Sequence, residues 1–166
     1  MLTPDHYFSS IVDVSPQFIQ KNGIKALILD IDNTLAEDFS PELRCDIAAW
    51  LSDIKKAGIK AVIVSNNDNV RAAPFAEKCG LEYISDAGKP SAKSSVRAFA
   101  LLDSSKTDTA VIGDQLFTDI AYGKRIGCRT ILTEKFSPDI LFFVRLKRLF
   151  ERPFMRRIRK RGVTKI

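Results

Sequence analysis

The 166-residue chain contains one histidine, His6, and three cysteines that lie far apart, Cys45, Cys79 and Cys128. A single histidine excludes mechanisms and zinc sites that need paired histidines, and a Ser-His-Asp triad would have to use His6 near the chain start. An odd number of distant cysteines, with no Cys-x-x-Cys pair, argues against a disulfide framework. We therefore interpret the cysteines as small thiols in a reducing compartment.

Long apolar runs are also missing, and none approaches the ~18 residues that a membrane-spanning helix needs. The first residues, Met-Leu-Thr-Pro-Asp-His, have neither the positive start nor the apolar core of a signal peptide. These two absences lead us to expect a cytoplasmic protein. The length is that of one ordinary domain, and an apolar content of 45% is enough for one buried core.

The net charge of +6 is spread unevenly along the chain. Residues 145–166 contain ten lysines or arginines and one acid, Glu151. The other 144 residues contain sixteen basic and nineteen acidic side chains. The basic character therefore belongs to the C-terminal segment and not to the globular part of the chain.

Short apolar runs without polar alternation predict strands that are buried on both faces, as parallel strands beneath helices are. The runs are Lys25–Leu29, Ile59–Val64, Thr109–Ile112 and Arg129–Leu132, with a weaker candidate at Glu82–Ile84. Amphipathic segments over 15–23, 40–58, 70–79, 91–102 and 116–126 predict helices between them. The alternation predicts an α/β domain over residues 1–137, with an open, mostly parallel sheet flanked by helices. Such sheets bind ligands beyond the carboxyl ends of their strands.

Two acids, Asp30 and Asp32, directly follow the first of these runs. Residues two apart in extended backbone point the same way, so both carboxylates are expected to face one pocket while Ile31 faces the core. Two such close carboxylates repel each other, which favours a proton on one of them or a cation between them. An acidic loop after a strand is the simpler alternative for this motif taken alone.

Polar groups follow two further strands. Ser65 and Asn66 come after Val-Ile-Val, where a hydroxyl and free backbone N–H groups can hold a phosphate. Lys89 lies in the turn Gly-Lys-Pro after the weaker strand, where its ammonium group could offset phosphoryl charge. Taken singly, each has an ordinary alternative, which is a helix cap for Ser65 and an exposed turn for Lys89.

A second acidic pair, Asp114 and Asp119, follows Ala-Val-Ile-Gly. The spacing of about one helical turn lets both carboxylates reach one hard cation that prefers oxygen ligands, as magnesium does. An acidic helix cap would explain Asp114 alone, but it would not explain acids at a second strand end.

The order of acid pair, hydroxyl, lysine and acid pair resembles the haloacid dehalogenase (HAD) superfamily of phosphatases. The resemblance spans about residues 25–132 and implies that Asp30 is the nucleophile and Asp32 the general acid and base, with Thr34 supporting them. It further implies that Ser65, Asn66 and Lys89 bind phosphate. The implied Mg²⁺ ligands are the carboxylate of Asp30, the carbonyl of Asp32, Asp114 and Asp119.

The intervals between the motifs are too short for a cap domain, so the chain is similar to capless HAD enzymes of subclass III. The phrases Asp-Ile-Asp-Asn-Thr-Leu, Val-Ser-Asn-Asn and Gly-Asp-Gln-Leu-Phe-Thr-Asp-Ile resemble bacterial YqeG-type phosphatases and mitochondrial phosphatidylglycerophosphatases. This closer resemblance implies phosphatidylglycerophosphate as substrate, hydrolysed to phosphatidylglycerol and phosphate. The uncapped site would admit a phosphate carried on a lipid head group.

The segment 138–166 is expected to form a basic amphipathic helix and tail. The stretch from Asp139 to Phe150 is apolar with basic residues in its later part, and a run rich in arginine follows it. Aromatic residues with dense cations are typical of a helix lying on an anionic membrane surface, so the protein is expected peripherally at the inner face of the membrane. The alternatives are a helix docked on the sheet with a solvated tail, and contact with nucleic acid, which no recognised motif supports. A soluble phosphorylated metabolite or a phosphoprotein remains an alternative substrate, and a non-catalytic binding module remains an alternative function.

Overall fold

The computed structural model describes residues 2–160, with side chains described through residue 158. This part of the chain forms a single six-stranded parallel sheet in the order β1-β6-β5-β2-β3-β4. The strands are β1 (His6–Phe8), β2 (Ala26–Leu29), β3 (Lys60–Val64), β4 (Glu82–Ile84), β5 (Thr109–Gly113) and β6 (Arg129–Thr133). The expected α/β fold is confirmed, and each of the five predicted runs forms a strand.

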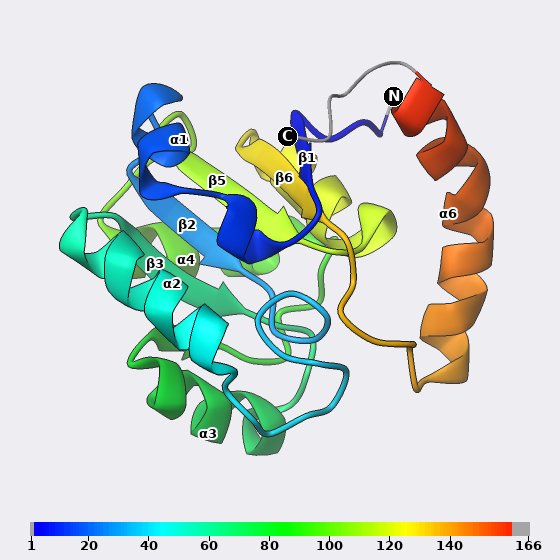
Figure 1. Cartoon of the computed structure of the whole chain (residues 1–166), viewed down its shortest axis with the longest axis horizontal. Coiled ribbons are helices and arrows are strands. Elements are labelled where there is room, and N and C mark those ends of the chain that lie inside the picture. The colour runs from blue at the N-terminus through cyan, green and yellow to red at the C-terminus, as the bar shows by residue number, and fades with distance from the viewer. Residues whose placement is uncertain (1, 161–166) are drawn as a thin grey trace.

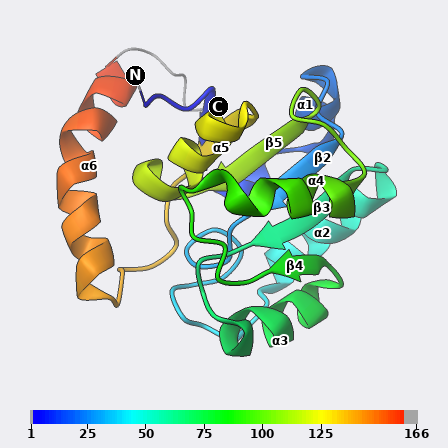
Figure 2. The ribbon, with the colours of Figure 1, turned by 180° about the vertical axis from the view of Figure 1, so that it is seen from behind.

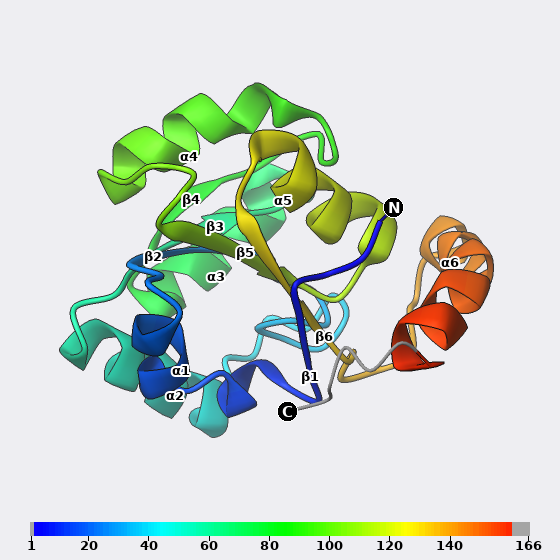
Figure 3. The same ribbon diagram turned by 90° about the horizontal axis from the view of Figure 1, so that it is seen from above.

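Helices cover both faces of the sheet, which gives three layers (Figures 2 and 3). The helices α1 (Pro16–Lys21), α2 (Cys45–Lys56) and α3 (Asn69–Cys79) lie on one face, where Trp50 and Phe75 contribute to the larger core cluster. The other face is covered by α4 (Ser95–Leu102) and α5 (Ala121–Ile126), whose Leu102 and Tyr122 belong to a second cluster. The strands are therefore buried on both sides, as their apolar composition predicts.

Strand β1 is not among the predicted strands. Its three residues, His-Tyr-Phe, contain two apolar side chains and are flanked by the polar Asp5 and Ser9, so they do not form part of an apolar run. The strand is held by tertiary contacts, because Tyr7 pairs with Leu132 of β6 and the backbone N–H of Asp5 donates to the carbonyl of Thr130. The sheet therefore gains an edge strand that only the folded chain reveals.

The predicted start of the second helix at Ser40 is wrong, since α2 begins at Cys45. The Ser40 hydroxyl accepts from the backbone N–H of Glu42 and so forms a local turn instead of a helix cap. Arg44 then stacks over the ring of Phe136 at 4.7 Å and pairs with Asp46 at 2.7 Å. These contacts hold the preceding segment outside the helix.

The C-terminal segment forms one helix, α6 (Phe142–Lys160). The helix begins at Phe142 and continues past Phe150 through Pro153 to Lys160. Its least exposed residues recur every three or four positions, which defines one docked face: Val144, Arg148, Glu151, Met155 and Ile158. Figure 1 shows α6 standing beside the rest of the fold, on the side toward which the strands point. No helix within residues 2–160 is both long and apolar enough to cross a membrane.

Candidate active site

Strands β2, β3 and β5 end level with one another at the centre of the sheet. Leu29 of β2 pairs with Ile63 on one side and with Ile112 on the other. Because parallel strands run in one direction, the residues that follow them gather at one edge. Asp30, Ser65 and Asp114 therefore meet there, as their places after the strands predict.

A cavity of about 250 Å³ opens at this edge. Six of the predicted site residues line it: Asp30, Asp32, Ser65, Asn66, Lys89 and Asp119. Phe143, Val144 and Lys147 of α6 form another part of its wall. Thr34 is fully buried, and its hydroxyl has no hydrogen-bond partner among the described residues. Asp114 instead lines an adjoining hollow together with Arg148.

Lys89 bridges two buried carboxylates. Its ammonium nitrogen lies 2.9 Å from Oδ1 of Asp30 and 2.6 Å from Oδ1 of Asp119. The side-chain amide of Asn66 fixes the lysine backbone by exchanging hydrogen bonds of 2.6 and 2.9 Å with it. Burial alone would lower the pKa of Lys89, but the carboxylates of Asp119 and Asp30 outweigh this effect and raise that pKa.

Asp30 is held in an environment that resists its ionisation. Burial, assisted by the neighbouring Asp119 carboxylate, raises the pKa of Asp30 to about 7, although Lys89 acts in the opposite direction. Burial also raises the pKa of Asp114 well above its ordinary value, despite the adjacent guanidinium of Arg148. Both shifts follow chiefly from burial, which disfavours the charged form of a carboxylate.

Asp119 reaches the cavity because of two local features. It lies in a π-helical turn, η3 (Leu116–Ile120), where its carboxylate accepts from the backbone N–H of Gln115 at 3.1 Å. Gly113 ends β5 directly beside it, and a Cβ atom at that position would overlap the Asp119 carboxylate. The predicted regular helix over 116–126 is therefore a wide turn followed by α5, and such turns occur often at functional sites.

Three carboxylates could hold a metal ion here. One oxygen each from Asp30, Asp114 and Asp119 lies within 4.8 Å of the other two. Oδ1 of Asp114 is buried and has no hydrogen-bond partner among residues 2–158. Closely grouped carboxylate oxygens are the ligands that hard divalent cations prefer, so the residues present fit such an ion.

Asp32 is oriented by groups from other segments. Its carboxylate accepts from the guanidinium of Arg71 at 2.9 Å, from the backbone N–H of Phe39 at 3.1 Å, and from the side-chain amide of Asn67. Arg71 lies in the first turn of α3, so the segment that follows β3 carries two of the phosphate-binding candidates, Ser65 and Asn66, and also a residue that holds Asp32. Asp32 and Asp30 line the same cavity, as their alternate spacing predicts.

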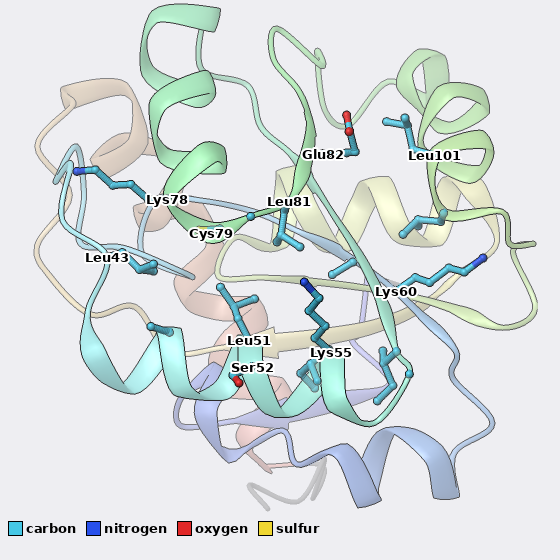
Figure 4. Close-up of a pocket in the computed structure, with 17 residues that line it drawn as sticks. Leu43, Leu51, Ser52, Lys55, Lys60, Lys78, Cys79, Leu81, Glu82 and Leu101 are labelled. Atoms are coloured by element: carbon cyan, nitrogen blue, oxygen red, sulfur yellow. The ribbon is translucent and has the colours of Figure 1, made fainter.

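A larger cavity of about 600 Å³ lies elsewhere, where β3 and β4 begin. Figure 4 shows its wall, which combines apolar side chains such as Leu51 and Leu81 with the lysines Lys55, Lys60 and Lys78. Among the described residues, Glu82 is the only acid that lines it. It lacks the grouped carboxylates of the smaller cavity, so size does not identify the reactive site.

Comparison with known proteins identifies the family. A model of the family described as mitochondrial PGP phosphatase matches residues 1–136. The chain belongs to this family. It is therefore a HAD-type phosphatase, and the predicted membership of the HAD superfamily is confirmed. The segment from β2 to β3 contains α2 and the segment from β3 to β4 contains α3, so neither holds a cap domain.

Two proteins with a described function are similar in sequence to this chain. A Bacillus subtilis (strain 168) protein described as "Probable phosphatase YqeG" is 35% identical over 159 residues, which cover 96% of this chain and 92% of that protein. The Arabidopsis thaliana protein "Phosphatidylglycerophosphate phosphatase 1, chloroplastic/mitochondrial" is 27% identical over 157 residues. That match covers 89% of this chain but 45% of the plant protein.

Two solved structures resemble this chain in fold. An uncharacterised protein from Listeria monocytogenes serotype 4b superposes with a TM-score of 0.58 at 18% identity, covering 71% of this chain and 85% of that one. The cobalt-bound deoxy-D-mannose-octulosonate 8-phosphate phosphatase from Haemophilus influenzae has a TM-score of 0.53 at 15% identity, covering 68% and 69%. At these identities the likeness concerns the fold alone.

Sequence reasoning missed Arg71 and Arg148 as site residues of this phosphatase. Arg71 follows the Ser65 motif by only six positions, and its place in the first turn of a helix that begins beside the motif was the available signal. Arg148 lies within a basic segment, where nothing in the sequence separates it from neighbouring arginines. Only the packing of α6 against the fold brings Arg148 to Asp114.

Proposed function

We propose that the chain is a Mg²⁺-dependent phosphomonoester hydrolase that works through an aspartyl-phosphate on Asp30. The observation that carries the proposal is the position of Asp30. Its carboxylate lies at the end of the central strand, in one cavity with Ser65, Asn66 and Lys89. The same carboxylate belongs to the group of three acids that can hold a cation. Nucleophile, phosphate-binding groups and cation ligands thus meet at one point.

The proposed reaction has two displacements at phosphorus. In the first, a carboxylate oxygen of Asp30 forms a bond to phosphorus while the bond to the leaving alkoxide oxygen breaks, and Asp32 donates a proton to that oxygen. In the second, water forms a bond to phosphorus and gives its proton to Asp32, and the bond to Asp30 breaks. Inorganic phosphate and an alcohol are released, and Asp30 is regenerated.

The remaining site residues bind and orient. Ser65 and Asn66 would hold the phosphoryl oxygens, and Lys89 would offset their charge while keeping Asp30 in place. Thr34 is buried and would help to orient Asp30 and Asp32. Mg²⁺ would be held by Asp30, Asp114 and Asp119 with the carbonyl of Asp32, and when bound it reduces the repulsion between a carboxylate and a phosphate dianion.

For the substrate we propose phosphatidylglycerophosphate, a phosphate ester at a lipid head group. The family description and the name of the plant relative support this choice. The cavity is also bordered by a helix, α6, that is suited to a membrane surface. Phe143 both lines the cavity and is exposed, so the site opens beside the apolar part of that helix.

The face of α6 that points away from the domain is largely apolar. At about 100° per residue, the exposed side chains of Phe142, Leu146, Leu149 and Phe150 fall roughly opposite the docked face. Phe143 and Phe154 are also exposed, but they lie toward one edge, where Phe143 lines the cavity and Phe154 contacts Phe117. Exposed cations border this face, with Arg145, Arg152 and Arg156 on one side and Lys147 on the other, and Arg157 lies within its C-terminal part. An apolar face with basic borders matches the interior and the anionic head groups of a lipid surface.

A liposome assay tests the lipid substrate. Phosphate release from phosphatidylglycerophosphate in anionic vesicles should exceed release from soluble phosphomonoesters, because α6 brings the enzyme to the surface. Changing Phe142, Leu149 and Phe150 together to serine should lower the lipid activity about tenfold or more, since three anchoring side chains are lost. Turnover of a soluble aryl phosphate should stay unchanged.

The matched control for this experiment changes two exposed valines, Val70→Ser and Val96→Ser, which lie on α3 and α4. The control should retain the lipid activity. Equal or faster turnover of soluble phosphomonoesters by the unmodified enzyme would contradict the lipid substrate and favour a soluble metabolite or phosphoprotein. Salt-sensitive RNA binding without any hydrolysis would favour a non-catalytic module.

A further inference from the structure

Arg148 connects α6 to the acidic end of β5. Its Nη2 atom pairs with Oδ2 of Asp114, and its Nη1 atom donates to the Asp114 backbone carbonyl at 2.5 Å. The same guanidinium lies 3.3 Å from Oδ1 of Asp139 and 3.4 Å from Oε2 of Glu151. One planar group thus fixes both the side chain and the backbone of Asp114, which a single ammonium could not do.

These contacts leave the two oxygens of Asp114 in different states. Oδ2 is taken by Arg148, whereas Oδ1 is buried and has no hydrogen-bond partner in the described part of the chain. A buried carboxylate oxygen without a donor is costly unless a ligand supplies the missing interaction. Because an oxygen of Asp114 also lies within 4.8 Å of one from Asp30 and one from Asp119, a cation is the ligand that fits.

Neighbouring acids reduce the electrostatic repulsion between Arg148 and a bound cation. Asp139 and Glu151 both face the guanidinium and are both buried. Lys135 pairs with Asp139 at 2.5 Å, so the four side chains together carry no net charge. Arg148 therefore orients Asp114 through directed hydrogen bonds while its own field is largely cancelled.

We propose that Arg148 is a positioning residue for the metal site, which turns Asp114 so that Oδ1 is presented to a divalent cation. The inference rests on the proposed cation of the phosphatase site and adds that helix α6 completes that site. Since coupling between two binding events is reciprocal, a bound cation should also hold α6 more firmly against the domain.

The test measures Mn²⁺ affinity of the purified full-length protein without substrate, by calorimetry or by the EPR signal of free Mn²⁺. Arg148→Ala should weaken the affinity about 10–100-fold, the usual range for loss of a residue that orients a metal ligand. Arg148→Lys should recover part of the loss, and free guanidinium should partly restore binding to Arg148→Ala. In unmodified protein, Mn²⁺ should slow backbone hydrogen exchange in α6.

Two matched variants separate positioning from simple attachment of the helix. Arg145→Ala removes an exposed arginine from the same helix and should not change the affinity. Ile158→Ala loosens the packing of α6 against Leu116 and Ile120 but leaves the guanidinium in place, so its loss of affinity should be far smaller than that of Arg148→Ala. Unchanged or tighter Mn²⁺ binding by Arg148→Ala overturns the inference, as does an equal loss in Ile158→Ala.

The two proposals fail in different ways. If the unmodified protein hydrolyses phosphomonoesters with Mg²⁺ while Arg148→Ala binds Mn²⁺ normally, the inference about Arg148 is wrong and the proposed function stands. If Arg148→Ala loses Mn²⁺ binding but the unmodified protein releases no phosphate from any ester, the inference stands and the proposed function is wrong. An unmodified protein that binds no divalent cation overturns the inference.

Discussion

Asp30→Asn is expected to reduce phosphate release by about four orders of magnitude or more, the scale seen when an enzyme loses its nucleophile. The substitution keeps the size of the side chain and removes the carboxylate oxygen that would attack phosphorus. Initial rates with saturating aryl phosphate and Mg²⁺ measure the effect. Asp38→Asn makes the same change of charge in the lining of the same cavity and should retain most of the activity.

The stability of Asp30→Asn should show that its lost activity is not caused by unfolding. Without metal, the pKa of Asp30 is raised from its ordinary value of 3.8 to about 7. The folded protein therefore loses stability as the pH rises through this range, because Asp30 ionises less readily in the folded than in the unfolded state. At pH 8 the melting temperature of Asp30→Asn should therefore equal or exceed that of the unmodified protein. The advantage should disappear near pH 4, where Asp30 is protonated. A variant that melts much lower at pH 8, or that keeps its activity, would contradict this account.

Lys89→Met is expected to impair both folding and catalysis. The ammonium lies between the buried carboxylates of Asp30 and Asp119, and the methionine side chain is nearly as long as that of lysine but carries no charge. Removing one partner from a buried ion pair typically costs about 3–5 kcal/mol, because the remaining charge has no compensation. Loss of the group that offsets phosphoryl charge should also lower kcat about 10²–10³-fold. Denaturant unfolding and steady-state kinetics measure the two effects.

A second substitution distinguishes the two consequences of losing Lys89. Adding Asp119→Asn to Lys89→Met removes one of the two facing carboxylates and should recover much of the lost stability without recovering activity. Lys93→Met, an exposed lysine in the following turn, serves as the control and should change neither quantity. If Lys89→Met is as stable and as active as the unmodified protein, the bridging role of Lys89 is wrong.

The sequence predicts the centre of the candidate site well, because the required information is local. Asp30, Ser65 and Asp114 each follow an apolar run, and the rule that parallel strands end at one edge is enough to bring them together. At Lys89, taken alone, the sequence favours an exposed turn over a site residue. Its burial between two acids depends on Asn66, which holds the lysine backbone from a different loop.

What the sequence does not predict is set by packing between distant segments. Arg71 reaches Asp32 only because α3 begins close to the cavity, and Arg148 reaches Asp114 only because α6 docks against η3. Glu151, the only acid of the basic segment, is buried and accepts from the backbone N–H of Phe117 at 2.9 Å. Its isolation among cations was visible in the sequence, but its partner was not.

The central claim is that Asp30 becomes covalently phosphorylated, and trapping that intermediate tests it most directly. In Asp32→Asn the group that activates water is lost, whereas an aryl phosphate with a good leaving group needs little protonation in the first step. Acid-quenched Asp32→Asn should therefore carry one phosphoryl group by intact mass, and peptide mapping should place it on Asp30. Phosphoryl attachment at another residue, or continued turnover with no phosphorylated protein at any time point, would contradict the account.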